Sequence, residues 1–461
     1  MTVLGEPDII GKIGRKSARI SVIGQGYIGL PTALLIADSG FQVVGYDINE
    51  GLINRLKGGE APFQEEGLED LLRRNLIAGR YFPTAEREDV KGSDVIIIAV
   101  PTPKSENGPN LSMLLSAFDT ALDSIKLGGL IVVESTLPPG TFELLARVIK
   151  GRGLKLGEDV FMSYCPERAL PGKLIRELKE NYRIIGSLDK HSGEATKLLY
   201  SYFVEGEIIL EDVRVVEVVK LVENSFRDVN IAFANEVARI CDVLGIDVYK
   251  VIELANKHPR VNILRPGVGV GGSCLTKDPL FLYWASKDRG FEPRVILESR
   301  RINDQMPIYS ADQLINALSV LGVKRGKVAI LGVTYKGNVS DVRESPAKDF
   351  INRLMERGID VVVYDPFTEE SFGAPRADSL EEALRGSVAV AFLADHDVFR
   401  YTSLKKYRKV MGNGIAVLFD GRMLFSREEA EEAGFVYIGP GAPLRIKQLV
   451  SRLSSIKYKL G

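Results

Sequence analysis

Cysteine and histidine are scarce in this chain of 461 residues, which contains three of each. The cysteines, Cys165, Cys241 and Cys274, are far apart, and none forms a CxxC pair or stands beside a histidine. This pattern excludes a disulfide framework and offers no ligand spacing typical of zinc. We therefore expect a reducing compartment, the cytoplasm, and no metal site.

Long apolar runs and excess charge are also lacking. No apolar run reaches about 18 residues, and the first 18 residues contain no apolar signal core. We therefore expect neither a membrane span nor export. The formal net charge is -1, so no overall field attracts nucleic acid or an anionic membrane. Local side chains must hold any anionic ligand.

Alternating strand and helix patterns occupy both ends of the chain. After a polar leader at residues 1–18, short β-branched runs alternate with apolar-periodic helices, and a second such alternation begins near Lys327. Residues 213–244 contain neither Gly nor Pro and predict one long helix, which connects domains or forms a dimer seam. The sequence predicts an α/β protein with two Rossmann-like, doubly wound parallel-sheet domains joined by a central helical domain.

A glycine motif, GQGYIG, spans Gly24 to Gly29. It follows a predicted strand, opens a helix, and is followed by Asp47 at the end of the next strand, as the dinucleotide fingerprint requires. The glycines allow a pyrophosphate to approach the helix N-terminus. A carboxylate at Asp47 favours NAD over NADP because it repels a 2′-phosphate. The alternative is a glycine turn in an unrelated α/β fold.

The segment GVGVGGSCLTKDP also matches GxGxxG, at Gly267, Gly269 and Gly272. No strand precedes it and no acidic partner follows, so we interpret these glycines as backbone that lies close to a ligand. Cys274 follows them, with Lys277 and Asp278 nearby. A lone cysteine is often a small buried hydrophobe. Beside a nicotinamide cofactor, however, a cysteine can capture an aldehyde and lose hydride to form a thioester, which water hydrolyses to an acid.

Lys220 and Asn224 lie four residues apart on the long predicted helix and share a face with Glu217 and Asp228. One interpretation of these four residues is a solvated polar face. The other is a pair of functional groups, Lys220 and Asn224, on the same side of one helix.

Eight motifs in order resemble the nucleotide-sugar 6-dehydrogenases, the UDP-glucose/GDP-mannose dehydrogenase family. They are GQGYIG, VPTP, ESTLPPGT, CPERALPG, KLVENSF, GVGVGGSCLTKDP, RINDQMP and LGVTYKGNVSDVRESP. The resemblance covers residues 19 to about 440. It implies an NAD-binding Rossmann domain at 19–210, a central helical dimerisation domain at 211–318, and a nucleotide-sugar (UDP)-binding domain at 319–461. The partners it implies are a UDP-sugar and a second copy of the chain, in a homodimer or higher homo-oligomer.

In this family the C6 alcohol of a sugar becomes a carboxylate at the cost of two NAD. By position, the catalytic residues fall on Cys274, Lys220, Asn224, Asp278, Glu167 and Thr136. The resemblance makes Cys274 the nucleophile and Lys220 the oxyanion donor. Asp278 positions water or assists proton transfer, Glu167 assists thioester hydrolysis, and Thr136 holds a water near the nicotinamide.

The resemblance also places the binding residues. Cofactor contacts fall on Gly24, Gln25, Gly26, Tyr27, Ile28, Gly29, Asp47, Thr102, Ser135, Thr136 and Arg343. Substrate contacts fall on Glu167, Arg168, Pro171, Lys220, Asn224, Arg260, Gly267, Gly269, Gly271, Tyr335, Lys336 and Arg422. The cationic side chains among them suit the charge of UDP. In relatives, the residue that matches Arg260 can come from a neighbouring subunit.

The motifs disagree about the sugar. The stretches around CPERALPG and NKHPRVNILRPG resemble enzymes of UDP-N-acetylhexosamines, above all of UDP-N-acetylmannosamine, whereas GGSCLTKD resembles the UDP-glucose enzymes. The longer stretches favour UDP-N-acetylmannosamine, or UDP-N-acetylglucosamine, as the substrate. Pro171 stands where many UDP-glucose enzymes have a second glutamate. The sequence leaves open a UDP-glucose 6-dehydrogenase, a dehydrogenase that stops at the aldehyde, and a non-catalytic nucleotide-sugar binding protein.

Overall fold

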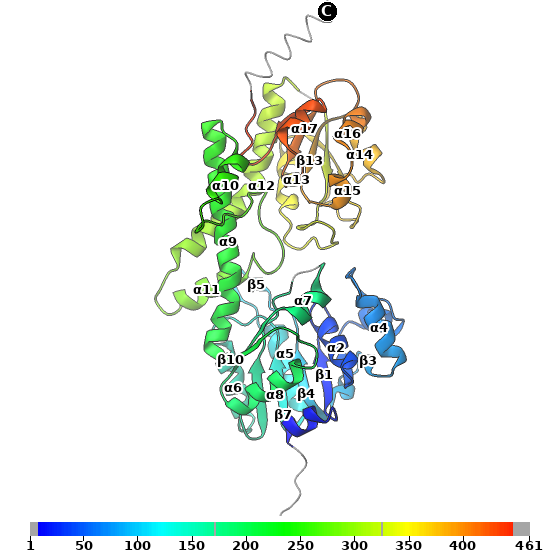
Figure 1. Ribbon diagram of the computed structural model, residues 1–461, viewed down its shortest axis with the longest axis vertical. Helices are drawn as coiled ribbons and strands as arrows, with labels where there is room; N and C mark the ends of the chain where they lie inside the picture. Colours follow the sequence, from blue (N-terminus) through cyan, green and yellow to red (C-terminus); the bar gives the residue numbers. More distant parts are fainter. Residues whose placement is uncertain (1–7, 170–171, 324–325, 446–461) are drawn as a thin grey trace, which may run out of the picture. The chain divides into compact units, whose positions relative to one another are not determined.

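The computed structural model describes residues 8–169, 172–323 and 326–445 (Figure 1). The chain forms two compact units, Met1–Glu223 with Leu280–Glu292, and Asn224–Pro279 with Pro293–Gly461. The border between the units falls inside the long helix α9, Val213–Leu244. The predicted domain boundaries at residues 210 and 318 stay predictions.

An eight-stranded sheet forms the centre of the first unit, in the order β10-β9-β8-β7-β4-β1-β2-β3. Its neighbouring strands run parallel except β8 and β9, which are antiparallel. The strands are β1 Arg19–Ile23, β2 Gln42–Tyr46, β3 Tyr81–Thr84, β4 Ser93–Ile98, β7 Ile125–Val133, β8 Val160–Tyr164, β9 Arg183–Ser187 and β10 Ile208–Asp212; β5 Lys104–Ser105 and β6 Gly108–Pro109 form a separate hairpin. The order around β1 is the doubly wound order, in which the strand sequence reverses between β1 and β4.

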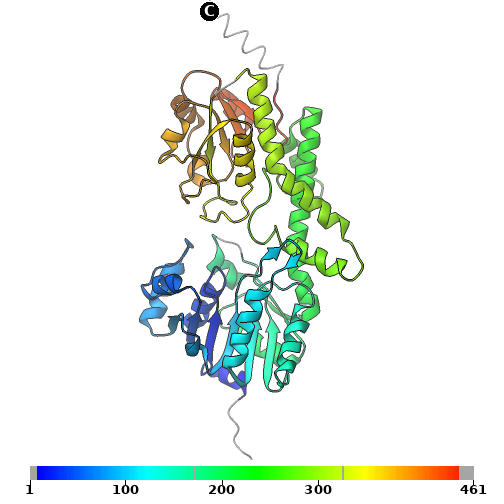
Figure 2. The ribbon, with the colours of Figure 1, turned by 180° about the vertical axis from the view of Figure 1, so that it is seen from behind.

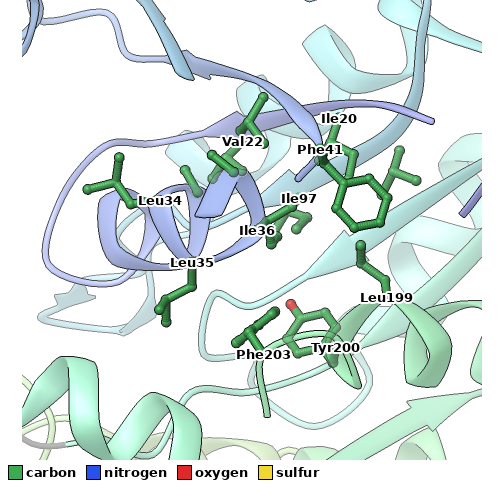
Figure 3. Close-up of a cluster of buried hydrophobic side chains, with 14 of the residues drawn as sticks. Ile20, Val22, Leu34, Leu35, Ile36, Phe41, Ile97, Leu199, Tyr200 and Phe203 are labelled. Atoms are coloured by element: carbon green, nitrogen blue, oxygen red, sulfur yellow. The ribbon is translucent and has the colours of Figure 1, made fainter. Parts of the chain in front are cut away.

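Helices cover both faces of this sheet. They are α1 Ile9–Gly14, α2 Gly29–Asp38, α3 Glu50–Lys57, α4 Leu68–Ile77, α5 Ser112–Ser124, α6 Thr141–Gly151, α7 Leu174–Glu180 and α8 Lys190–Tyr200, with a 3₁₀ turn, η1, at Arg87–Val90. Figure 3 shows one of the two cores, where Ile20 and Val22 of β1 meet Leu34 of α2 and Leu199 of α8. The other core joins the opposite side of the strands to α5, α6 and the first turn of α9.

The segment expected to be a polar leader contains a helix. In α1, Asp8 caps the first turn by accepting a hydrogen bond from Gly11 N at 2.8 Å, and Ile9 and Ile13 are buried in the core. Tyr202 also donates to the carbonyl oxygen of Gly14 at 3.1 Å. The leader prediction was therefore wrong for residues 9–14, because two isoleucines four apart form an apolar face on a short, otherwise polar segment.

The second unit contains a five-stranded parallel sheet in the order β12-β11-β13-β14-β15. Its strands are β11 Lys327–Leu331, β12 Asp360–Tyr364, β13 Ser387–Phe392, β14 Val417–Asp420 and β15 Val436–Ile438, and its flanking helices are α13 Ala347–Glu356, α14 Leu380–Leu384, α15 Asp397–Arg400, α16 Leu404–Met411 and α17 Arg427–Glu432. Helices α12 and α13 bury one face, and α14, α16 and α17 bury the other. The strand order reverses between β11 and β13, where a ligand site is expected in such a sheet.

Four more helices complete the described chain: α9, α10 Val248–Ala255, α11 Asp278–Lys287 and α12 Arg294–Val320. The second half of α9 lies beside α12, as Figure 2 shows. Asn235 donates to Asn303 Oδ1 at 2.9 Å, and Tyr309 donates to Asp242 Oδ2 at 2.7 Å. The predicted α/β architecture with a long central helix is confirmed. None of the described helices is both long and apolar enough to cross a membrane.

Candidate active site

The glycine turn after β1 is shaped by contacts within the first unit. Gly24 has a φ of 93°, and a Cβ atom there would lie 2.6 Å from the carbonyl oxygen of Ala99. A Cβ atom at Gly29 would lie 1.8 Å from the carbonyl oxygen of Gly24. These two glycines are therefore needed by the turn itself.

Gly26 differs from its neighbours, because no described atom lies within 4 Å of where its Cβ atom would stand. Its φ is also outside the left-handed region. The fold alone does not require glycine here, whereas a ligand that lies against the backbone would. The side chain of Gln25 is buried, with Nε2 donating to the carbonyl oxygen of Val22, so this side chain is turned away from a cofactor.

Asp47 follows β2 at the same edge of the sheet. Its Oδ2 accepts from Gln25 N at 2.8 Å and its Oδ1 accepts from Asn49 N at 2.9 Å. These bonds fix the carboxylate beside the glycine turn while leaving it partly exposed. This is the arrangement that a ribose-binding carboxylate needs.

Thr102, Ser135 and Thr136 lie together where β4 and β7 end. Thr102 Oγ1 donates to the carbonyl oxygen of Thr136 at 2.9 Å, and Val100 N donates to Ser135 Oγ at 2.9 Å. The structure thus brings the predicted cofactor residues of the first unit to the carboxyl ends of β1, β2, β4 and β7.

The four polar residues on one face of α9 are not solvated. Glu217, Lys220, Asn224 and Asp228 are exposed by 1%, 7%, 7% and 0% of their surfaces. Glu217 accepts from the amides of Gly140 and Phe142, both at 2.8 Å. The solvated-face interpretation was wrong, because buried polar groups persist only where they have partners.

Lys220 is held by the turn that follows β8. Its Nζ donates to the carbonyl oxygen of Glu167 at 2.5 Å. The Glu167 carboxylate accepts from the amides of Arg168 and Ala169, at 2.6 and 2.5 Å, and forms a buried ion pair with Arg183 of β9. Both Glu167 oxygens are therefore engaged by protein donors.

Glu134, directly after β7, belongs to the same buried cluster. Tyr200 OH donates to its Oε1 at 2.6 Å and Thr32 Oγ1 donates to its Oε2 at 3.2 Å. Burial raises the pKa of Glu134 to about 7, while the charge of Arg183 opposes the rise and that of Glu167 adds to it. A carboxyl group that titrates near neutrality thus stands one residue before Ser135.

In the second unit, Cys274 is exposed, whereas Cys165 and Cys241 are buried. Its carbonyl oxygen accepts from the amides of Lys277 and Asp278, at 3.2 and 2.9 Å, so the thiol stands on the turn that leads into α11. Asp278 is fully buried; its Oδ1 accepts from Lys277 Nζ at 2.8 Å and its Oδ2 from Asn224 Nδ2 at 2.7 Å. The structure therefore brings Asn224 and Asp278 together beside the cysteine turn.

The glycines before Cys274 pack against protein. A Cβ atom at Gly271 would lie 2.6 Å from Tyr335 Cβ, and one at Gly269 would lie 3.0 Å from Pro346. Gly267 lies beside Gly421 and Arg422. Close approach to other segments accounts for glycine at these positions, and their contact with a ligand stays a prediction.

Tyr335 and Arg422 meet at the carboxyl end of the second sheet. Arg422 Nη2 donates to the carbonyl oxygen of Tyr335 at 2.5 Å, and its Nε donates to that of Leu393 at 2.8 Å. Tyr335 and Lys336 follow β11, and Arg422 follows β14. This end of the sheet therefore gathers the predicted substrate residues of the C-terminal part.

Family models match the chain in three consecutive parts. They are the NAD binding domain of the UDP-glucose/GDP-mannose dehydrogenase family at residues 18–204, its central domain at 214–305, and its UDP binding domain at 329–427. The chain belongs to the UDP-glucose/GDP-mannose dehydrogenase family. It is an NAD-dependent nucleotide-sugar dehydrogenase, and NAD is its cofactor.

Relatives in this family align along almost their whole length. The chain is 41% identical to UDP-N-acetyl-D-mannosamine dehydrogenase of Methanococcus maripaludis over 92% of this chain and 97% of that protein. The UDP-N-acetyl-D-mannosamine dehydrogenase structure from Pyrococcus horikoshii is 40% identical, with a TM-score of 0.85, and covers 92% of this chain and 99% of that chain. A UDP-glucose dehydrogenase structure from Pyrobaculum islandicum is 29% identical, with a TM-score of 0.81, over 96% and 99%.

Arg343, Arg260 and Arg168 are further predicted site residues of this family member. Arg343 makes a two-bond pair with Asp341, at 2.9 and 2.6 Å, and Arg260 is exposed after α10. Arg168 pairs with Glu223 at 3.0 Å and lies over the Tyr182 ring. Pro171 lies outside the described residues. No group of three or more His, Cys, Asp or Glu in the described ranges is placed to hold a metal.

Sequence reasoning missed several buried polar residues: Glu134 and Arg183 in the first unit, and His396 and Arg300 in the second unit. Arg300 donates to Asp228 Oδ1 at 2.5 Å and reaches the carbonyl oxygen of Leu275, beside Cys274, at 3.4 Å. The available signal was a charged residue at the edge of an apolar strand, as at Arg183 and Glu134.

Proposed function

We propose that this enzyme oxidises the C6 alcohol of a UDP-N-acetylhexosamine, UDP-N-acetylmannosamine in preference to UDP-N-acetylglucosamine, to the uronic acid through a Cys274 thioester. The observation that carries the proposal is the exposed Cys274 on a turn beside the buried Asn224–Asp278 pair. The high identity to UDP-N-acetylmannosamine dehydrogenases supports the choice of sugar.

The glycine turn, Asp47, Thr102, Ser135 and Thr136 would hold NAD, which would accept the hydride in both oxidations. The C6 alcohol first loses hydride and a proton to give the aldehyde. Cys274 Sγ then adds to the aldehyde carbon, and the thiohemiacetal loses a second hydride and a proton to become a thioester. Water breaks the C–S bond, and the sulfur leaves as the thiolate with the carboxylate as product. One sugar thus consumes two NAD and one water.

The polar face of α9 serves the oxygen at C6. An ammonium or amide that donates to this oxygen stabilises its developing negative charge. Lys220 and Asn224 are suited to this because their partners hold them buried and on the same helix face. We assign the orientation of water to Asp278 and Thr136.

Glu167 contributes to hydrolysis in this proposal by holding Lys220. Its carboxylate accepts three hydrogen bonds from protein donors, two at Oε1 and one at Oε2. Its carbonyl oxygen already contacts Lys220 Nζ.

The proposed assembly is a homodimer formed through α9. Apolar side chains at Val215, Val218, Val222, Phe226, Phe233 and Ile240 are exposed at spacings of three, four or seven residues, which places them along one face of the helix. A second copy of the same face is a self-complementary occupant of such a stripe. Exposed Arg260 is then available to a neighbouring subunit. A cytoplasmic location stays a prediction.

The deciding experiment measures NADH formed to completion from UDP-N-acetylmannosamine, UDP-N-acetylglucosamine and UDP-glucose. We expect two NADH per acetamido sugar and little from UDP-glucose. Two NADH from UDP-glucose alone would overturn the choice of sugar and keep the chemistry. One NADH per sugar would support a dehydrogenase that stops at the aldehyde.

The variant Cys274→Ser is the matched test of the thioester. It should form no uronic acid, because serine is a far weaker nucleophile at neutral pH. Cys241→Ser is the control, since that thiol is buried on the far part of α9. Normal acid formation by Cys274→Ser would remove the nucleophile assignment.

A further inference from the structure

Two loops meet at the point where the strand order of the second sheet reverses. The turn Tyr335–Asn338 follows β11, and Asp395, His396 and Asp397 follow β13. In this strand order the ligand site lies between these two strands, outside their carboxyl ends. Tyr335 and Lys336 are the predicted substrate contacts on the first loop.

Four hydrogen bonds join the second loop to the turn. Gly337 N donates to Asp395 Oδ1 at 2.9 Å, and Asn338 N donates to His396 Nδ1 at 2.8 Å. The Asn338 side chain both donates to Asp397 Oδ2, at 2.7 Å, and accepts from Asp397 N, at 2.9 Å. Asn338 has a φ of 59°, so the turn is held in a backbone conformation that few residues adopt.

His396 is fully buried, and its two nitrogens have different partners. Nδ1 faces an amide donor and must therefore be the unprotonated nitrogen. The proton then lies on Nε2, which faces Asp365 Oδ2 at 3.1 Å and Thr334 Oγ1 at 3.2 Å. Thr334 Oγ1 itself donates to the carbonyl oxygen of Lys336 at 2.8 Å. The imidazole is thus oriented by Asp365.

Asp365 is a fixed anchor for this ring. Its Oδ2 accepts from His396 Nε2 and from Val333 N at 2.7 Å, and its Oδ1 accepts from Phe367 N at 2.8 Å. The ring of Phe367 stacks on the imidazole, with centroids 4.7 Å apart. The ring therefore has one orientation, with Nδ1 directed at Asn338.

We propose that His396 is a positioning residue for the nucleoside diphosphate: through Nδ1 it fixes the turn that presents Tyr335 and Lys336 to the ligand. This inference rests on the proposed substrate contacts of Tyr335 and Lys336. Arg422, which donates to the carbonyl oxygen of Tyr335, fixes the other end of the same turn. His396 is fully buried and contacts the turn, so we expect its effect to fall on affinity for the nucleotide.

Two substitutions test the two ring nitrogens of His396 separately. His396→Asn keeps an acceptor where Nδ1 stands and removes the donor to Asp365. His396→Gln keeps a donor where Nε2 stands and removes the acceptor for Asn338. Calorimetric titration with UDP and, separately, with NAD measures both, together with KM and kcat for UDP-N-acetylmannosamine.

We expect His396→Gln to weaken UDP binding about tenfold, as for the loss of one buried hydrogen bond, and His396→Asn to stay within about threefold of the wild type. KM for the sugar nucleotide should rise in His396→Gln while kcat and NAD affinity change little. His191→Gln, the same substitution in the first unit, is the matched control and should leave UDP affinity unchanged.

A further variant, Lys336→Met, separates the substrate contact from the positioning role. If it binds UDP as the wild type does, the turn is not the nucleotide site and the proposed contacts fail. If it weakens UDP binding but both His396 variants bind normally, the positioning role alone is wrong. Equal losses of UDP affinity in His396→Asn and His396→Gln, or a parallel loss of NAD affinity, would also overturn the positioning role. Either result would indicate general damage to the fold.

Discussion

Lys220 illustrates how a charged residue becomes available for chemistry. It is buried on α9, yet its ammonium contacts a backbone carbonyl oxygen and not a carboxylate. A lysine held in this way is positioned to donate to a developing oxyanion. We expect Lys220→Ala to lower kcat about a hundredfold or more, as for loss of an oxyanion donor. Steady-state kinetics checks this, with Lys250→Ala, an exposed side chain on α10, as the control. An unchanged kcat in Lys220→Ala would exclude the oxyanion role.

The Glu167–Arg183 pair should behave as a unit in stability. Both side chains are almost fully buried. Arg183→Met leaves the Glu167 carboxylate without its cation, and removal of one partner of a buried pair costs about 3–5 kcal/mol. The double variant Arg183→Met/Glu167→Gln should recover part of this loss. Calorimetric unfolding of the four proteins measures the coupling, and strictly additive losses would contradict it.

Glu134 should make stability depend on pH between about 4.5 and 7. Its pKa rises from an ordinary 4.5 to about 7 on folding, first because of burial. The folded state therefore keeps a proton that the unfolded chain releases, and stability falls as the pH rises through this range. As the pH rises from 5 to 8, the Tm of the wild type should fall relative to the Tm of Glu134→Gln. If the difference in Tm between the two proteins stays constant over this pH range, or grows in favour of the wild type, Glu134 stays ionised in the folded state.

Among the helices and strands, α1 is the one whose contribution to stability is hardest to predict from the sequence. Ile13 is completely buried against the first core. We expect Ile13→Ala to cost about 2–5 kcal/mol through loss of buried surface and the cavity left behind. Arg15→Ala, an exposed change at the end of the same helix, should cost less than about 0.5 kcal/mol. Equal, small shifts in Tm for both variants would show that α1 does not support the core.

The regular elements were largely predictable because periodicity is local. The glycine turn, the strands around it and the helix over residues 213–244 were all predicted from neighbouring residues. Helix α1 was missed because it is only six residues long, and the antiparallel join of β8 and β9 was missed because direction in a sheet is set by distant connections.

The buried polar networks could not be predicted for the same reason. The hydrogen-bond partners of His396 lie far from it in the sequence: Asp365 is 31 positions away and Asn338 is 58 positions away. Glu134 and its partner Tyr200 are 66 positions apart. Such pairs carry no periodic signal in one sequence. The motifs identified Lys220, Asn224, Cys274 and Asp278, but only the structure shows which of them are partners.

For the whole molecule, the exposed apolar face of α9 predicts a dimer. Phe226 is 64% exposed and Val222 48% exposed, although both are apolar. Phe226→Asp and Val222→Asp would place a charge in the proposed seam and should give monomers. Light scattering on the protein as it elutes from a size-exclusion column measures the mass. Lys250→Asp, at an exposed side chain on α10, is the control. A wild-type monomer would exclude the dimer, and a Phe226→Asp dimer would place the interface elsewhere.

The continuity of α9 also limits how this chain can evolve. Lys220 and Asn224 are separated by one helical turn, and one belongs to each unit. One residue inserted between them would rotate every later residue of α9 by about 100° and move it about 1.5 Å along the axis. Asn224 would then leave the face that Lys220 occupies. Insertions and deletions can accumulate in the loops of this enzyme, but in this turn a single added codon changes the phase of the helix and separates the pair.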